Sequence, residues 1–367
     1  MYIQTPAFLT PFEARAILFS CIEPGHFFWT AQISQFGPLK TLESILSGQY
    51  PAEKTKAIIT SIRAADVGQI LYESEKAGAK FLTPFEARAI LFSAIEPGHF
   101  FWTAQISQFG PLKTLESILS GEYPAEKTKA IITSIRSAEV GQILFEIEKA
   151  GAKFLTPEHE HWPQGVNQLI NPPIGLIVTG DSSSLITPAL AIVGSRKPTT
   201  YGAHVASDFA RAFSDLGWTI ISGGAYGVDS FAHRATLQAN GRSIAVLATG
   251  IEVAYPKSNQ KLFDEMKVNG ALISELMPHE NAVPSRFLVR NRLIASIAKA
   301  TLVVEAAFQS GSLRTARDAA ELLRPVMAIP GPINSAMSQG CHRLISERAA
   351  ELITSVADAV EFIGVKQ

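Results

Sequence analysis

Four short loops rich in glycine, serine and arginine contain residue types that could bind an anion. The first is Gly194-Ser195-Arg196, and the second is the segment SGGAYGVD at 222–229. The others are RFLVRNR at 286–292 and SGSLRTA at 310–316. Glycine lets the backbone approach a ligand closely, amides at a helix start attract anions, and a guanidinium holds phosphate through two hydrogen bonds. Phosphate binding is therefore the chemistry that these residues could perform.

The loop at 222–229 has three glycines within five residues, directly before a predicted helix. Its exposed amides could form a nest for an anion. The loop contains neither GxGxxG nor the Gly-Lys-Ser/Thr of a Walker A motif, so it does not predict a dinucleotide site. Asp229 is interpreted as the N-cap of the next helix. A catalytic pair of Asp229 with His233 is the alternative, but no nucleophile stands at a clear strand-to-helix elbow, and we expect no catalytic residue.

The segment at 286–292 combines three arginines with Phe287. Guanidinium groups bind phosphates, and an aromatic ring can stack on a base. The wider window 286–324 has seven basic and three acidic residues, whereas the whole protein has a net charge of −1. Any nucleic-acid binding must therefore come from a local patch. A solvated helix face with Phe287 in the core is the alternative interpretation.

The loop at 310–312 follows an apolar run that ends at Glu305. Its hydroxyl groups could cap a helix or hold phosphate, and Glu305 could hold a ribose hydroxyl or pair with an arginine. A plain surface turn explains any one of the four loops. Four such loops at one edge of a sheet instead predict a site for a nucleotide or a phosphate-bearing polymer.

Short apolar runs alternate with helical segments from residue 173 onward, and this alternation must position the four loops. The predicted strands are residues 175–178, 190–193, 219–222, 243–247, 272–274, 301–304 and 326–329, and the predicted helices are 202–216, 230–239, 258–268, 290–298 and 313–323. The pattern predicts an α/β domain with a Rossmann-like, doubly wound parallel sheet. Ligands of such sheets bind beyond the carboxyl ends of the strands, where the four loops lie.

The N-terminal part contains one sequence twice, because residues 8–80 match residues 81–153 except at six positions. The differing pairs are 21/94, 49/122, 64/137, 66/139, 72/145 and 74/147, and the last sets Ser74 against Ile147. A recent duplication or a sequence-assembly error explains this better than a solenoid does.

Each copy is predicted to be a small all-helical domain, with helical segments in the second copy at 86–95, 101–109, 112–119 and 125–151. Its turn QFGPLKTL could belong to a helix-hairpin-helix or SAM-like module, and a plain helical packing domain is the alternative that we favour. The predicted domains are 8–80, 81–153, a linker at 154–172, the Rossmann-like domain at 173–334 and its C-terminal extension at 335–367. We expect the second copy to dock normally, and the first to be tethered beside it or to swap between subunits.

Composition excludes several classes of protein. Hydrophobic residues make up 47% of the chain and charged residues 18%, which is typical of a folded protein. Cys21 and Cys341 stand far apart without a CxxC pair, which fits a reducing cytoplasm and predicts neither a disulfide framework nor a metal site. The first residues do not resemble a signal peptide, and no apolar run is long enough to span a membrane. No cofactor is predicted.

Six motifs resemble the DprA (Smf) family of DNA-processing proteins. They are IVGSRKPTTYG, SGGAYGVDSFAH, VLATGIEVAYPKSNQ, FLVRNRLIA, TLVVEAAFQSGSLRTA and AIPGP, in this order between about 175 and 331. The resemblance implies a cytoplasmic homodimer that binds single-stranded DNA during DNA-mediated transformation. It also implies a recombination mediator that protects incoming DNA and loads the RecA recombinase, rather than an enzyme.

The loops and the resemblance together give one set of candidate DNA- or phosphate-binding residues. The set is Gly194, Ser195, Arg196, Ser222, Gly223, Gly224, Lys257, Phe287, Arg290, Asn291, Arg292, Ser310, Gly311 and Ser312. The chain departs from the family's pattern at Ala248, Glu252 and His342, where glycine, aspartate and asparagine are usual.

A second family, the LOG nucleoside-monophosphate phosphoribohydrolases, shares the predicted fold and gives the alternative function. Its motif PGGxGTxxE ends in a catalytic glutamate, whereas this chain has SGSLRTARD with Asp318 at that place. Release of ribose 5-phosphate from AMP would identify that activity.

Overall fold

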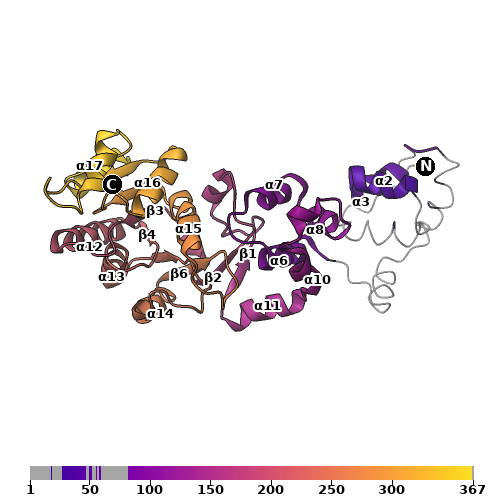
Figure 1. The fold of residues 1–367 in the computed structure, drawn as a ribbon, viewed down its shortest axis with the longest axis horizontal. Coiled ribbons are helices and arrows are strands. Elements are labelled where there is room, and N and C mark those ends of the chain that lie inside the picture. The colour runs from indigo at the N-terminus through magenta and orange to yellow at the C-terminus, as the bar shows by residue number, and fades with distance from the viewer. Residues whose placement is uncertain are drawn as a thin grey trace. The chain divides into compact units, whose positions relative to one another are not determined.

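The computed structural model describes residues 18, 27–46, 49–51, 55, 58 and 82–365. The chain forms two compact units, Met1–Thr83 and Pro84–Gln367 (Figure 1). Cys21 and most of the first helical copy lie outside the described residues.

The described part of the first unit has the same local structure as its counterpart in the second. Helices α2 (Phe27–Phe36) and α3 (Pro38–Leu46) correspond to α7 (Phe100–Phe109) and α8 (Pro111–Leu119). Gly37 and Gly110, which separate the two helices of each pair, both have φ of 80°, a left-handed conformation that favours glycine. The same sequence therefore forms the same helix–turn–helix in both copies.

The second copy is helical throughout, and its chain turns more often than its sequence predicts. Besides α7 and α8 it contains α6 (Pro84–Ala94), α9 (Ala125–Thr128), α10 (Ile132–Ser137) and α11 (Val140–Lys149). The longer helical stretch expected over 125–151 is thus three helices. Ala138 and Glu139 have extended backbone and separate α10 from α11. Ile135, before this break, and Ile143, after it, are both buried.

Residues 154–172 are packed into the second unit and do not run freely between domains. Strand β1 (Lys153–Leu155) pairs antiparallel with β2 (Leu176–Gly180). Phe154 lies between the rings of Phe85 and Phe92, with centroid distances of 5.6 and 5.0 Å. Trp162 and Val166 are fully buried in the core of the sheet domain. The expected linker therefore joins the helical domain to the sheet through buried contacts.

The sheet has nine strands in the order β1-β2-β6-β5-β4-β3-β7-β8-β9. The remaining strands are β3 (Ala189–Val193), β4 (Thr219–Ser222), β5 (Ser243–Val246), β6 (Gly270–Ser274), β7 (Ala300–Val303), β8 (Val326–Ala328) and β9 (Glu351–Leu352). Strands β3 to β9 pair in parallel, as predicted, but β2 runs antiparallel to β6. Only a short 3-10 turn joins β2 to β3, and a parallel arrangement needs a longer crossover.

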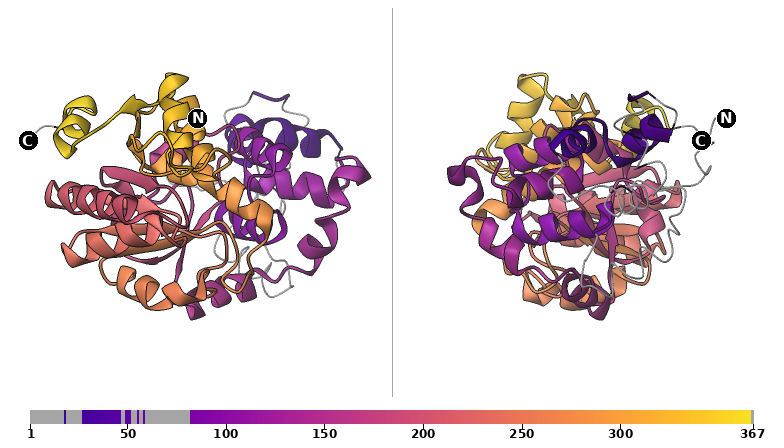
Figure 2. Two further views of the ribbon diagram at one scale, coloured as in Figure 1. Left: turned by 60° about the vertical axis from the view of Figure 1, so that its left-hand side comes forward. Right: turned by 90° about the vertical axis from the view of Figure 1, so that its right-hand side faces the viewer.

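Helices cover both faces of the sheet, so the doubly wound expectation is confirmed. One face packs against α12 (Thr200–Asp215) and α13 (Val228–Gln238). The other packs against α15 (Pro284–Ile297), α16 (Ser312–Glu321) and α17 (Gln339–Ser346). The two layers can be followed in Figure 2. Helices α14 (Gln260–Met266) and α18 (Val356–Phe362) complete the domain.

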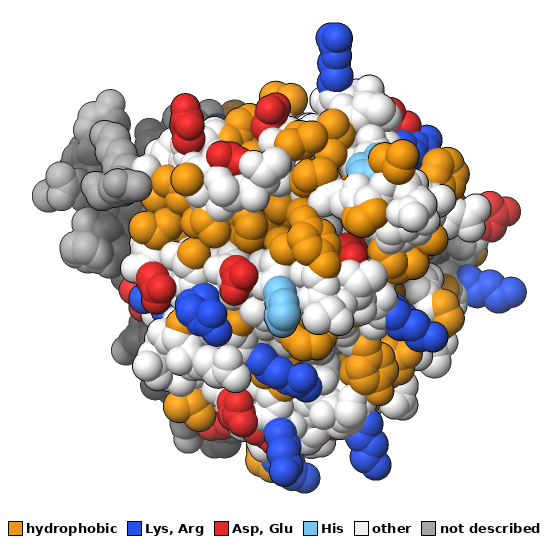
Figure 3. All heavy atoms as spheres, turned by 90° about the vertical axis from the view of Figure 1, so that its left-hand side faces the viewer, with side chains coloured by type: hydrophobic (Ala, Val, Ile, Leu, Met, Phe, Trp, Pro, Cys, Tyr) orange, Lys and Arg blue, Asp and Glu red, His pale blue; other side chains and the backbone are white. Residues whose placement is uncertain are grey.

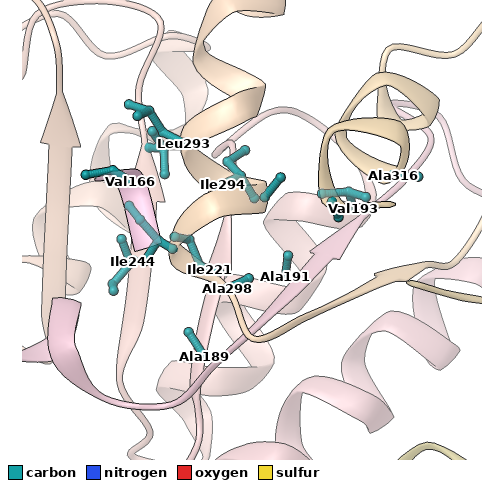
Figure 4. Packing of buried hydrophobic residues seen from close by; sticks show 14 of the residues in the cluster. Val166, Ala189, Ala191, Val193, Ile221, Ile244, Leu293, Ile294, Ala298 and Ala316 are labelled. Carbon is teal, nitrogen blue, oxygen red and sulfur yellow. The ribbon is translucent and has the colours of Figure 1, made fainter. Parts of the chain in front are cut away.

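Alternate residues of each central strand enter different cores. Ala189, Ala191 and Val193 of β3 enter the core that α15 and α16 also line, and Figure 4 shows Val193 beside Ala316. Leu190 and Ile192 point to the opposite face, toward α12 and α13. Both sets are almost fully buried, so each central strand is apolar along its whole length, which is the pattern that made the strands recognisable in the sequence.

Candidate functional site

Three of the four predicted loops follow β3, β4 and β7 at one edge of the sheet, whereas the segment 286–292, predicted as the other, lies in helix α15 (Pro284–Ile297). Strands β5, β4, β3 and β7 are consecutive neighbours and parallel, so the loops that follow them lie side by side. Helix α15 crosses this edge, and it starts at Pro284, six residues earlier than predicted, because proline is well suited to the first turn. Its side chains contact the loops on both sides.

The glycine loop at 223–227 is occupied by a carboxylate of the protein itself. Asp229 Oδ2 accepts hydrogen bonds from the amides of Gly223 and Ala225, at 3.1 and 3.2 Å. Gly224 and Gly227 have φ of 67° and 80°, which turns the loop back toward the first turn of α13. Asp229 is therefore not the N-cap, a position held by Gly227. The predicted anion nest is satisfied internally in this conformation.

Arg290 ties two of the loops together from inside the protein. Its Nη1 donates to the carbonyl oxygens of Gly223, at 2.7 Å, and Val246. Burial lowers the pKa of Arg290 to about 10, and the nearby Asp229 opposes that shift. A Cβ on Gly223 would lie 2.4 Å from this guanidinium, so the site needs glycine there.

Arg292 forms a buried ion pair and does not face solvent. Its Nη2 lies 2.7 Å from Oε1 of Glu275, and both side chains are less than a tenth exposed. Asn291, between the two arginines, donates to the carbonyl oxygen of Gly311 at 3.3 Å. Ser222 is also buried, and its hydroxyl donates to the carbonyl oxygen of Ile192 at 2.6 Å. These polar groups hold the edge of the sheet in shape.

The third arginine of the segment, Arg286, joins the sheet domain to the second helical copy. Its Nε and Nη2 donate to the carboxylate of Glu96, at 3.1 and 2.6 Å. Its Nη1 donates to Glu280 at 3.0 Å. Hydrogen bonds to the two carboxylates raise the pKa of Arg286. The three arginines of this segment therefore have three different sets of partners, although they lie close together in the sequence.

Four side chains form the accessible part of the site, which we call the outer cluster: Arg196, Tyr255, Lys257 and Phe287. The guanidinium carbon of Arg196 lies 5.4 Å from the ring centroid of Phe287. The ring of Tyr255 lies 5.1 Å from the same ring and is inclined to it by 60°. Arg196 and Lys257 are exposed, and Phe287 is half-buried. The cluster can offer two cations and two aromatic faces to one ligand.

Tyr255 is the one member of the outer cluster that was not among the sequence candidates. It stands in the segment VAYPKSNQ, two residues before Lys257. An aromatic residue next to proline and lysine in a loop after a strand was the available signal. Its contact with Phe287, which is distant in sequence, could not be read from that signal.

The remaining candidates lie around the outer cluster and mostly bond to one another. The hydroxyl groups of Ser310 and Ser312 share a hydrogen bond of 2.7 Å. Ser195 Oγ accepts from the amide of Lys197 at 3.0 Å. Gly194 packs closely, since a Cβ there would lie 2.7 Å from Val228. Gly224 is buried, and Gly311 is exposed.

Two acidic residues that could have had chemical roles are bound within the protein. Glu305 accepts from the amide and the hydroxyl of Thr199, at 2.8 and 2.7 Å, and so fixes the start of α12. Asp318 lies 2.7 Å from Nε of Arg314. Burial raises the pKa of Asp318 to about 6.

His233 does not form the alternative catalytic pair with Asp229. It is fully buried, and its Nδ1 lies 2.8 Å from Oγ of Ser243. Burial lowers the pKa of His233 to about 3, so the ring is neutral near pH 7. The carboxylate of Asp229 bonds to the amides of the glycine loop, and the imidazole of His233 bonds to Ser243.

Other surfaces of the second unit do not coincide with this edge. A groove of about 740 Å³ lies between α12 and α18 and is lined by apolar residues such as Leu216 and Val360. It adjoins the end of α12 that precedes β4, away from the four loops. Figure 3 shows hydrophobic side chains gathered in a band on the end of the molecule that carries α12, α13 and α17.

The described residues bear on membrane insertion and on metal binding. Within them, no helix combines the length and apolar character that crossing a bilayer requires. The same residues contain no cluster of three or more histidine, cysteine or acidic side chains placed to hold a metal ion.

Comparison with known proteins gives matches that extend over most of the chain. The family described as DNA recombination-mediator protein A matches residues 153–364. A putative DNA processing protein DprA of Mycobacterium tuberculosis is 35% identical over 294 residues, which cover 76% of this chain and 75% of that protein. DNA processing protein DprA of Streptococcus pneumoniae is 38% identical over 199 residues, covering 54% of this chain and 70% of that protein.

Solved structures show the same relationship in three dimensions. The X-ray structure of DNA processing protein A from Streptococcus pneumoniae has a TM-score of 0.67 at 29% identity, and the match covers 77% of this chain and 98% of that one. A structure of DNA processing protein A from Helicobacter pylori, described by its single-stranded DNA binding mode, has a TM-score of 0.53 at 30% identity. That match covers 59% of this chain and 96% of the other.

Proposed function

The chain belongs to the DNA recombination-mediator protein A family, known as DprA or Smf, and from this premise we propose that it binds single-stranded DNA at the outer cluster. The observation that carries the proposal is the placement of Arg196 and Tyr255 against the ring of Phe287, with the exposed Lys257 two residues after Tyr255. Cations for phosphates next to aromatic faces for bases are what single-strand binding needs.

The charge distribution supports a local binding site. The protein has a net charge of −1, so it is not drawn to DNA by its overall field. Arg196 and Lys257 supply the phosphate contacts, and Phe287 and Tyr255 supply stacking that tolerates every base. The buried Arg290, Asn291 and Arg292 fix the loops that present this surface. The Helicobacter pylori relative, described as binding single-stranded DNA, supports the same class of ligand.

The proposal extends to the biological role that the motifs imply. In this role the protein acts as a homodimer, protects incoming single-stranded DNA during transformation and loads the RecA recombinase onto it. DNA binding at the outer cluster is the step on which the others depend. We expect the protein to act by binding, without catalysis of its own.

The double variant Arg196→Ala/Lys257→Ala is expected to bind single-stranded DNA more weakly and with less dependence on salt. Each lost phosphate contact lowers the slope of log affinity against log salt by about 0.7, so two contacts lower it by about 1.4. A titration of a labelled oligothymidine at several salt concentrations measures both effects. The double variant Arg211→Ala/Lys267→Ala removes the same charge from α12 and from the end of α14, and it is the matched control.

Two outcomes would contradict this assignment. Wild-type protein without affinity for single-stranded DNA would refute the function itself. An unchanged salt slope in the Arg196→Ala/Lys257→Ala variant, with binding retained, would move the site elsewhere. Wild-type affinity for duplex DNA is expected to be lower, because its bases are not available for stacking.

Deleting residues 8–80 is expected to leave both stability and single-strand binding unchanged. The unit Pro84–Gln367 contains all the helices of the second copy, α6 to α11, and the sheet domain. Ile147, buried in that copy, is replaced by Ser74 in the first copy, and losing a buried isoleucine side chain costs about 2–5 kcal/mol. Urea unfolding and the DNA titration test this, and a clear loss of either property would show that the first copy is needed.

A further inference from the structure

A second pair of an arginine and an exposed aromatic ring lies at the same edge of the sheet. Phe308 is 52% exposed in the loop after β7. The guanidinium carbon of Arg343, on α17, lies 4.8 Å from the centroid of that ring. This repeats the pairing of Arg196 with Phe287 at 5.4 Å.

Backbone contacts connect this second pair to the first. The amide of Ala306 donates to the carbonyl oxygen of Met337 at 2.8 Å. The carbonyl oxygen of Ala306 in turn accepts from the amide of Gly340 at 2.7 Å. These bonds attach the start of α17 to the loop that carries Phe308. Met337 Sδ in turn lies 3.4 Å from Oγ of Ser195, the neighbour of Arg196. The segments that carry the two pairs are therefore attached to one another.

Neither member of the second pair is used to fill the core. The side chain of Arg343 is 37% exposed, and its Nε lies 2.6 Å from Glu347 one turn along α17. A single exposed aromatic residue needs no explanation. A ring held beneath a guanidinium on the edge that carries the outer cluster has the two groups that one nucleotide needs.

We propose that Phe308 and Arg343 form a second nucleotide-binding position for the strand bound at the outer cluster. The ring of Phe308 stacks on a base, and Arg343 contacts the adjoining phosphate. This inference rests on the proposed function and extends its site from one side of β3 to the other.

The spacing of the strands suits this arrangement. Tyr255 follows β5 and Phe308 follows β7, and three strand intervals separate β5 from β7 in the sheet. Neighbouring strands are about 4.8 Å apart, so the interval is roughly 14 Å. Several nucleotides span such a distance, and single-strand-binding folds cover roughly 4–16 nucleotides. A strand lying across the ends of β5, β4, β3 and β7 reaches both pairs.

The variant Phe308→Ala is expected to weaken binding of a labelled oligothymidine about fivefold to tenfold, the lower part of the range for loss of one base stack. Its salt dependence should match that of the wild type, because no phosphate contact is lost. Phe308→Tyr keeps an aromatic face and should bind like the wild type. Phe145→Ala removes a similarly exposed ring, 56% accessible, from α11 and is the matched control.

An oligonucleotide of abasic sites separates stacking from general damage. The wild type should lose affinity when bases are removed, and Phe308→Ala should lose less because one stack is already gone. Arg343→Gln should show the converse, a lower salt slope with the preference for bases retained. Both variants change exposed side chains, and urea unfolding checks that they fold.

The outcomes keep this inference apart from the proposed function. If the wild type binds and Phe287→Ala weakens binding while Phe308→Ala has no effect, the second position is refuted and the outer cluster stands. If Phe308→Ala weakens abasic and normal strands equally, stacking at this position is refuted. If the wild type does not bind single-stranded DNA at all, the proposed function fails first.

Discussion

Replacing Arg292 with alanine is expected to lower the free energy of unfolding by about 3–5 kcal/mol, the cost of leaving one member of a buried ion pair alone. Glu275 would keep a carboxylate in a site where its side chain is only 6% exposed. Burial already raises the pKa of Glu275, and the charge of Arg292 opposes that rise. Without Arg292 the carboxyl group must take up a proton or draw water into the core.

Urea unfolding at pH 7 measures this loss, and a second variant tests its cause. The double replacement Arg292→Met/Glu275→Met removes both charges and is expected to recover much of the lost stability, since apolar substitutes for a buried pair are often neutral. Arg211→Ala, at an exposed ion pair of α12, should change the stability by less than about 1 kcal/mol. If Arg292→Ala is as stable as the wild type yet fails to bind DNA, Arg292 contacts the ligand directly and our assignment is wrong.

Replacing Asp229 with alanine is expected to destabilise the protein by about 3 kcal/mol and to abolish most single-strand binding. The amides of Gly223 and Ala225 would lose their acceptor, and the buried Arg290 would lose its nearest negative charge. Arg290 also holds Gly223 and Val246 together. The loops beside the outer cluster would then lose their fixed positions.

The emptied glycine loop offers a specific test of this explanation. Inorganic phosphate is expected to raise the unfolding temperature of Asp229→Ala more than that of the wild type, because the freed amides and Arg290 can receive an anion. Asp229→Asn keeps one acceptor and should lie between the two. Asp208→Ala removes an exposed carboxylate from α12 and is the control. Equal effects of phosphate on all variants would show that Asp229 does not fill an anion nest.

Much of the fold could be predicted because the strands and their loops have strong local signals. The strand at 219–222 was predicted with its observed bounds, and others differed by one or two residues. These strands are buried on both faces, so they are short, continuous apolar runs. Strands β1 and β9 were missed, because each begins with a charged residue, Lys153 or Glu351, and neither gives a continuous apolar run. The direction of β2 was missed as well, since it depends on the connection to β3.

The arginine segment shows where prediction from the sequence ended. Arg286, Arg290 and Arg292 were predicted as one basic cluster, but Arg290 and Arg292 lie on different sides of α15, and Arg286 lies one turn nearer its start. Positions two apart on a helix point about 200° away from each other. Arg290 and Arg292 therefore meet different neighbours, and Arg286 meets Glu96 of the helical domain. A count of charges in a window could not separate these three environments.

Local patterns were enough to predict that loops rich in glycine follow the parallel strands, because strand period, glycine and proline act over a few residues. They also indicated the edge of the sheet at which we propose that the ligand binds. Which groups remain accessible there depends on the tertiary structure. Arg290 and Arg292 are buried and form hydrogen bonds with Val246 and Glu275, which lie 44 and 17 positions away in the sequence. Arg196 stays exposed beside Phe287. Burial and pairing of a charge depend on distant segments brought together by folding, so local patterns do not specify them.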